Sequence, residues 1–121
     1  TGSFDGQGYT ISNLDIVAYK RSSVGLFGFT QNATITDVFL FNPHVQGRNN
    51  TGSLVGESQG TSISGVGVTG GSVYGLRKVG GLVGFTNTSP SPEAKRSHIE
   101  ESFAKTTVTG LSEVGGFVGY A

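Results

Sequence analysis

Acidic side chains are the residues of this sequence that could hydrolyse a glycosidic bond or bind a cation. Two carboxyl groups that face each other within a few ångströms are needed for glycoside hydrolysis, and several acidic residues in one loop are needed for calcium. The eight acids are scattered along the chain, and the segment EAKRSHIEE mixes both signs of charge. We therefore predict no catalytic residue, no metal site and no cofactor. The acids are Asp5, Asp15, Asp37, Glu57, Glu93, Glu100, Glu101 and Glu113.

The remaining composition excludes other kinds of chemistry. His44 and His98 are the two histidines, and neither belongs to a recognisable Ser/His/Asp set. The absence of cysteine excludes a disulfide framework and a cysteine-based metal site. Eight Lys and Arg balance eight Asp and Glu, so no basic excess indicates nucleic acid or an anionic membrane surface. No apolar run is long enough to span a membrane.

Glycine-rich blocks recur along the chain and predict a repeat architecture. The blocks are VGLFGF (24–29), GSLVGE (52–57), GGLVGF (80–85) and GGFVGY (115–120), and their closing glycines lie 28, 28 and 35 residues apart. The longest spacing contains SPSPEAKR, residues 89–96, which we interpret as a loop insertion. The residues that define the repeat are the closing glycines Gly28, Gly56, Gly84 and Gly119 and the apolar residues Leu26, Leu54, Leu82 and Phe117.

Short β-branched stretches accompany each block, and none has the period of a helix. One unit of three such stretches cannot bury its own apolar side, whereas stacked copies can. We therefore predict one all-β domain over residues 1–121, a parallel β-helix-like solenoid of about four coils. The glycines would lie at sharp turns with positive φ, or where stacked backbones leave no room for a Cβ. Interior rows are expected from Leu26, Leu54, Leu82 and Phe117, from Phe27, Val55, Val83 and Val118, and from Ile11, Ile35, Ile63 and Ile99.

The blocks resemble the GLUG-motif repeat of bacterial surface and secreted proteins. The core stands here as Gly25-Leu26-Phe27-Gly28 and Gly81-Leu82-Val83-Gly84, and FDGQGYTI (4–11) and IEESFA (99–104) are similar to the stretches that accompany it. Ser53, Glu57 and the 89–96 insertion depart from the pattern. The resemblance implies a β-helix-like scaffold of extracellular adhesins and of accessory regions of secreted proteases, without catalytic residues.

Three sets of residues could bind or carry a ligand. Sequons make Asn32, Asn49 and Asn87 candidate glycosylation sites. Phe29, Phe85 and Tyr120 follow the closing glycines and could stack on sugar rings. Rows of hydroxyls beside the isoleucines could order water as in ice-binding proteins, although solvent-facing strands favour Thr and Ser without any such function. These hydroxyl residues are Thr10, Ser12, Thr34, Thr36, Ser62 and Ser64.

These patterns together favour a non-enzymatic, extracellular structural and adhesive module that presents binding surfaces at the cell surface. The chain starts at Thr1 and stops inside a repeat, so we expect it to be a piece of a longer repeat protein. Its open ends would accept neighbouring repeats or another subunit. The alternatives are a filament subunit that assembles end to end and is glycosylated, and a module that binds glycans or ice. Cell-surface proteins and glycans are the other expected partners.

Overall fold

The computed structural model describes residues 2–18, 20–87 and 98–120, which form seventeen β-strands and no helix. Every strand pair among them is parallel. The prediction of an all-β fold is therefore confirmed. No described residue belongs to a helix long and apolar enough to cross a bilayer.

The strands belong to four sheets, named A to D in the order in which the second pass, from β5 to β9, reaches them. Sheet A contains β1 (Gly2–Asp5), β5 (Ala33–Thr36), β10 (Ser62–Ser64) and β14 (His98–Glu100). Sheet B contains β2 (Thr10–Ser12), β3 (Asp15–Val17), β6 (Phe39–Phe41), β7 (His44–Gln46), β11 (Gly67–Tyr74) and β15 (Phe103–Thr109). Sheet C contains β8 (Asn49–Thr51), β12 (Arg77–Gly80) and β16 (Ser112–Gly115). Sheet D contains β4 (Phe27–Gln31), β9 (Val55–Gln59), β13 (Val83–Asn87) and β17 (Val118–Tyr120).

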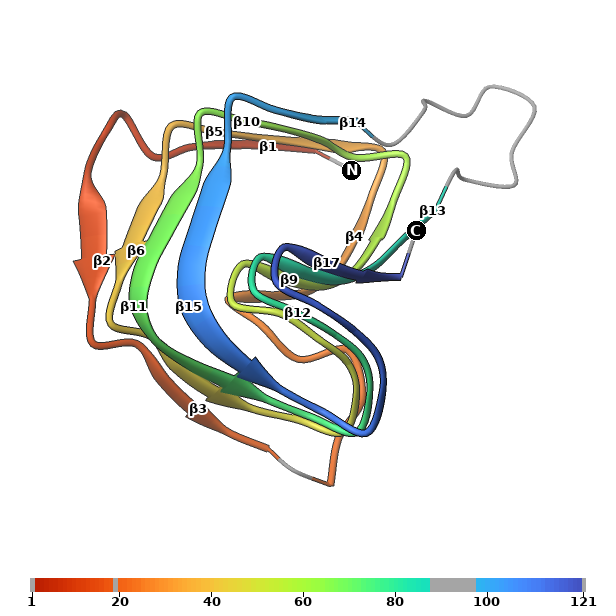
Figure 1. The fold of residues 1–121 in the computed structure, drawn as a ribbon. Helices are drawn as coiled ribbons and strands as arrows, with labels where there is room; N and C mark the ends of the chain where they lie inside the picture. The colour runs from red at the N-terminus through yellow and green to blue at the C-terminus, as the bar shows by residue number, and fades with distance from the viewer. Residues whose placement is uncertain (1, 19, 88–97, 121) are drawn as a thin grey trace.

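The chain visits these sheets in a recurring order, so successive passes lie on one another (Figure 1). Ile35 pairs with Ile63, and Val55 pairs with Val83, each 28 residues further along the chain. An isolated bridge from Val24 to Thr51 takes the place of a sheet C strand in the first pass. Residues 89–96, which we interpret as a loop insertion, lie outside the described residues.

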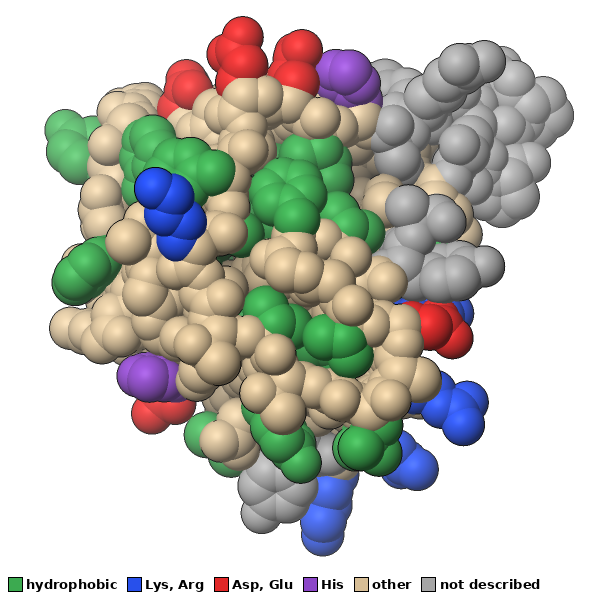
Figure 2. All heavy atoms as spheres, in the orientation of Figure 1, with side chains coloured by type: hydrophobic (Ala, Val, Ile, Leu, Met, Phe, Trp, Pro, Cys, Tyr) green, Lys and Arg blue, Asp and Glu red, His purple; other side chains and the backbone are tan. Residues whose placement is uncertain are grey.

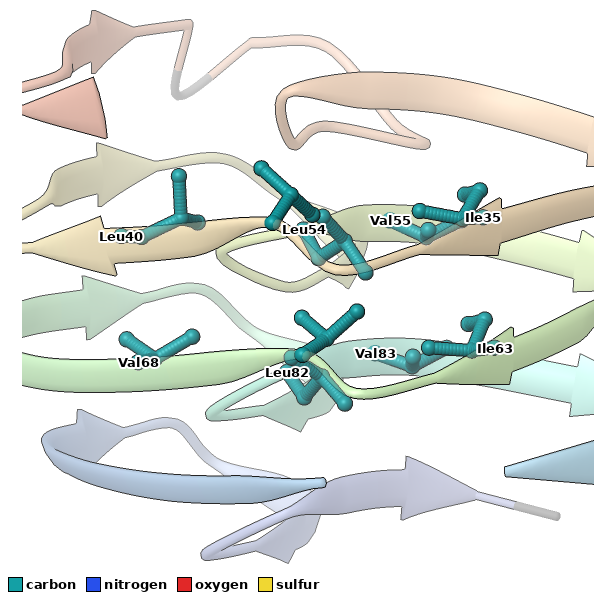
Figure 3. Packing of buried hydrophobic residues seen from close by; sticks show 10 residues of the cluster. Ile35, Leu40, Leu54, Val55, Ile63, Val68, Leu82 and Val83 are labelled. Atoms are coloured by element: carbon teal, nitrogen blue, oxygen red, sulfur yellow. The ribbon is translucent and has the colours of Figure 1, made fainter. Parts of the chain in front are cut away.

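Equivalent apolar residues of successive passes form the core between the sheets. Leu54 and Leu82 are fully buried, as are Val55 and Val83 beside them (Figure 3). Leu26 and Phe117, the outer members of the leucine row, are partly buried and pack against this core. Full burial of one such side chain contributes roughly 1.5–3 kcal/mol, so the two middle passes contribute the most hydrophobic stabilisation.

The closing glycines allow close approach of backbones and do not provide left-handed turns. Gly28, Gly56, Gly84 and Gly119 are absent from the residues with positive φ, so the expectation of positive φ is wrong for them. A Cβ on Gly84 would lie 2.7 Å from the carbonyl oxygen of Gly56, and a Cβ on Gly119 would lie 2.6 Å from that of Gly84. Such distances are far inside van der Waals contact, so the glycine column lets consecutive passes stack.

Bends between and within the sheets use left-handed residues, most of which are not glycine. These residues stack at equivalent positions of successive passes, as the strand registers require. Asn42 Nδ2 donates a hydrogen bond to Asn13 Oδ1 at 3.2 Å, which links two such bends. One column contains Asp37, Gly65 and Glu101, a second contains Asn13, Asn42 and Gly70, a third contains Ser23, Asn50, Lys78 and Glu113, and a fourth contains Asn32 and Gly60.

Two features of the predicted repeat need correction. Phe4, not Ile11, pairs with Ile35, whereas Ile11 pairs with Leu40 in sheet B. The cause is the left-handed bend at Asp37, which places Ile35 and Leu40 in different sheets although they look like one strand in the sequence. The repeat also has a further strand position, in sheet C, where a polar strand such as Asn49–Thr51 gave no apolar signal.

We predict that Gly84→Ala lowers the free energy of unfolding by about 2 kcal/mol or more, because overpacking against backbone cannot relax. Gly116→Ala is the matched control, since a Cβ at Gly116 has no atom within 4 Å and its φ is not positive. Chemical denaturation of both variants measures the difference. Equal stability of the two variants would contradict the proposed role of the glycine column.

We also predict that Glu101→Gly raises the free energy of unfolding by about 0.5–1 kcal/mol, because glycine removes the cost of the left-handed conformation at φ 49°. The opposite change in the same column, Gly65→Ala at φ 65°, should lower stability by about 1 kcal/mol. Thermal unfolding measures both effects: the Tm should rise for Glu101→Gly and fall for Gly65→Ala. Tm shifts of the same sign would contradict the prediction.

Candidate binding surfaces

The two ends of the stack expose strand edges. One end consists of β1, β2, β3 and β4, and the other of β14, β15, β16 and β17, and among the described residues each of these strands pairs along one edge. The second edge carries backbone N–H and C=O groups that can pair with a further strand. We call these surfaces the first and the last end face.

Both end faces also expose apolar side chains whose equivalents in the middle passes are buried. Ile99 of the last pass is partly buried, whereas Ile63 beneath it is 1% exposed. At the first end face, Phe4 is 39% exposed, and its ring meets that of Phe27 edge-on with centroids 5.3 Å apart. A hollow of about 430 Å³ opens beside these two rings. Figure 2 looks along the stack and shows hydrophobic side chains in the middle of the face in view.

The predicted aromatic row in sheet D is interrupted. Phe29 pairs with Glu57, which pairs with Phe85, which pairs with Tyr120. Phe29 is 49% exposed, but Glu57 separates the two phenylalanines in the strand register. Its carboxylate accepts a hydrogen bond from Ser23 Oγ at 3.3 Å. Lys78 Nζ covers Phe85, 4.2 Å from the ring centroid. Phe29 and Phe85 therefore do not form one continuous stacking surface.

Aromatic side chains that the sequence reasoning missed cluster on sheet B. Phe39 and Phe103 flank Gly67 in register, and a Cβ on Gly67 would lie 2.5 Å from Cζ of Phe103 and 3.0 Å from Cδ1 of Phe39. Phe41, on the same strand as Phe39, is 52% exposed. Lys105 Nζ lies 5.9 Å from the Phe103 ring centroid. The signal was Phe39 and Phe41 at alternate positions of one strand, on either side of the buried Leu40.

The three sequons lie in strands or at bends. Asn32 is half-buried at a left-handed bend, and its Oδ1 is buried without a hydrogen-bond partner. Asn49 is half-buried in β8, and Thr51, whose hydroxyl completes its sequon, is 0% exposed. Asn87 ends β13, and the rest of its sequon lies outside the described residues. A sugar on Asn49 would therefore have to be attached before the chain folds.

The hydroxyl rows on sheet A differ from the expected ones. Thr34 pairs with Ser62, which pairs with His98, so an imidazole ends this row. Thr36 and Ser64 continue into Glu100, whose Oε2 lies 3.3 Å from Nε2 of His98. Thr10 and Ser12 are in sheet B, opposite Phe39 and Phe41. The row is therefore not a regular array of hydroxyls.

Among residues 2–18, 20–87 and 98–120, no three His, Cys, Asp or Glu side chains lie close enough together to hold a metal ion. Glu100 and Glu101 are neighbours in the chain, but Asp37 and Gly65 occupy the bend positions equivalent to Glu101.

The chain is similar to Halomucin from Haloquadratum walsbyi (strain DSM 16790 / HBSQ001), with 44% identity over 124 residues. The match covers 98% of this chain and 1% of Halomucin, so the chain spans about 1% of the length of the curated relative that it matches. No family model and no solved structure matches the chain.

We predict a coupling energy of about 0.5–1 kcal/mol between Lys78 and Phe85, as is usual for a cation over an aromatic ring. A double-mutant cycle of Lys78→Gln and Phe85→Leu in chemical denaturation measures this energy. Lys105→Gln with Phe103→Leu is the control pair, whose coupling should be smaller because of its longer distance. Equal couplings in the two cycles would show that the Lys78–Phe85 contact is not special.

Proposed function

We propose that the chain is a β-solenoid of about four coils with a repeat near 28 residues, and that it serves as a non-enzymatic, extracellular structural and adhesive module. The observation that carries the proposal is the in-register parallel pairing of every sheet, from one open end face to the other. Stacked passes make a stiff body whose outer surface repeats at each pass, as suits a scaffold that presents binding surfaces.

The similarity to Halomucin supports a mucin-like surface protein outside the cell. The resemblance of Gly25–Gly28 and Gly81–Gly84 to the GLUG-motif repeat supports the same kind of location. Both similarities favour a structural role over catalysis, and the scatter of acidic side chains agrees with that. We propose that residues 1–121 form one such module within a longer repeat protein.

Stacking explains how the module would extend. Each pass adds a strand to every sheet, about 4.8 Å further along the axis. The exposed edges and half-buried apolar residues of the end faces suit another pass of the same kind, whether it comes from the same chain or from another subunit. The neighbouring repeat is thus the first partner that we propose.

A subunit of a filament that grows by joining end faces is the second candidate, and the half-buried Ile99 and Phe117 of the last end face favour it. Sugars on Asn32, Asn49 or Asn87 would decorate such a filament. Glycan stacking by Phe29, Phe85 and Tyr120, and ice binding by the hydroxyls of sheet A, have weaker support, because Glu57 and His98 interrupt these rows.

A sequence duplication tests the solenoid proposal. A second copy of residues 59–87, appended after residue 121, should stack on the last end face and raise the Tm by several degrees, because it buries Ile99 and Phe117. The control carries Leu82→Asp and Val68→Asp in the appended copy only. An appended copy that leaves the Tm unchanged, or that behaves like the control, would contradict the proposal.

Electron microscopy of the unmodified chain then separates the two candidates. Filaments with an axial period of about 19 Å, the height of four strands, would favour the self-assembling subunit. A monodisperse monomer would contradict the filament and agree with the module.

A further inference from the structure

Most of the positive charge of this neutral protein lies along one corner of the stack. Five of the eight Lys and Arg residues lie in or next to sheet C. Figure 2 shows blue side chains gathered at the lower right and red ones mainly at the top edge. Although the net charge is zero, the positive and the negative side chains therefore lie on different parts of the surface. The cationic residues are Lys20, Arg21, Arg48, Arg77 and Lys78.

Backbone register holds these cations close together. The N–H of Arg48 donates to the carbonyl of Arg21 at 2.8 Å, so these two residues lie in neighbouring passes. Arg77 pairs with Asn49 of the preceding pass, and its N–H lies 3.4 Å from the carbonyl oxygen of Arg48. Passes about 4.8 Å apart thus bring three arginines close together on neighbouring passes, where like charges oppose folding.

Among the described residues, no ion pair offsets the repulsion between these arginines. Arg21, Arg48 and Arg77 are exposed, and none forms an ion pair with an acidic side chain in the described part of the chain. Lys78 is half-buried above Phe85. An arrangement that costs stability and leaves three guanidinium groups facing solvent is suited to an external anion.

Two adjoining hollows form a groove between these cations. The larger, of about 550 Å³, is lined by Arg48, Asn49, Leu76, Arg77, Leu111 and Ser112. The smaller, of about 310 Å³, shares Asn49 and Arg77 with it and also contains Lys78 and Glu113. We call the two hollows together the sheet C groove.

The groove is lined by apolar as well as cationic side chains, and a small inorganic anion would not need the apolar ones. Leu111 is 81% exposed, and Leu76 lies in the preceding pass, its carbonyl accepting the N–H of Leu111 at 2.9 Å. Leucine side chains suit the C–H faces of a pyranose ring, and the Asn49 amide suits its hydroxyls. Guanidinium groups bind carboxylate and sulfate with paired, charge-assisted hydrogen bonds.

We propose that the sheet C groove binds an acidic polysaccharide, with Arg48 and Arg77 on its carboxylate or sulfate groups and the two leucines under its sugar rings. This inference deepens the proposed function and rests on it only in assuming that the module meets polysaccharides outside the cell. The repeat of cations from pass to pass matches a ligand that is itself a chain of regularly spaced charges.

Nucleic acid suits the groove less well. Proteins that bind single strands provide aromatic side chains for the bases, and no aromatic residue lines either hollow. Proteins that bind duplexes neutralise many phosphates and are generally basic as whole domains, whereas this chain has a net charge of zero. The acidic bend column of a second copy, with Asp37 and Glu101, is the other alternative occupant.

Titration of the 121-residue chain with dextran sulfate, alginate and neutral dextran tests the proposal. We expect at least one of the two anionic polymers to bind and neutral dextran not to bind. The polymer that binds more tightly shows whether the groove prefers sulfate or carboxylate. Arg48→Gln and Arg77→Gln should each weaken binding about threefold to tenfold. Glu113→Gln should strengthen it, because it removes the one acid that lines the groove.

Lys105→Gln on sheet B is the matched control, since it removes the same charge away from the groove and should leave the affinity unchanged. Leu111→Ser should weaken binding without any change of charge, which a purely electrostatic contact would not show. Thermal unfolding of each variant confirms that it is folded.

Three results would overturn the proposal. These are no binding of either anionic polymer, an equal loss for Lys105→Gln and Arg77→Gln, and equal affinity for single-stranded dT oligonucleotides. Sedimentation that shows self-association abolished by Arg48→Gln would instead assign the groove to a second copy. All of these failures leave the duplication experiment unaffected, so they are distinguishable from a failure of the solenoid proposal.

Discussion

Backbone hydrogen bonding between successive passes is the interaction on which the rest of this structure depends. Because each strand pairs in parallel with its equivalent 28 to 36 residues away, a residue in one pass constrains the residues at the same position in the other passes. A leucine in one pass needs an apolar neighbour in the next, which explains why Leu54 and Leu82 are buried together. The same rule applies to charge, and it brings Arg21 and Arg48 side by side at the cost of repulsion.

Glycine is often used in proteins for two reasons, close approach of backbones and a positive φ. In this stack the two requirements fall at different positions. At the closing glycines, the constraint is space, since a Cβ on Gly119 would lie 2.6 Å from the carbonyl oxygen of Gly84. At the bends, the constraint is a positive φ, and polar residues such as Asn50 and Lys78 adopt it. Asparagine tolerates this conformation because its short side chain can hydrogen-bond locally, but lysine and glutamate have no such advantage. The stacked neighbours must therefore hold these residues in place.

The sequence predicted the strands that are marked by regularly spaced apolar residues. It did not predict the features that depend on bends and on polar residues. The blocks around Leu54 and Leu82 were readable because a buried leucine between glycines is distinctive. Ile11 was aligned with Ile35 because the bend at Asp37 leaves no trace in hydrophobicity, and Phe4 holds that position instead. Sheet C was missed because its strands are short, and each has at most one apolar residue other than glycine, such as Val79 in β12. The cationic corner was missed for another reason: net charge is a sum over the chain, and it says nothing about how folding separates the charges.

Parallel strands give the stack a direction, and the two end faces are consequently different surfaces. One presents the Phe4 and Phe27 rings, and the other presents Ile99 and Phe117. Joining one face to the other is a heterologous contact, with a different patch on each side, and such a contact does not close after two copies. Two-fold symmetry is therefore unavailable to an interface that continues the sheets in register. Growth along the axis is therefore polar, because each end adds a different surface. A cap that stops growth must be complementary to one particular end face.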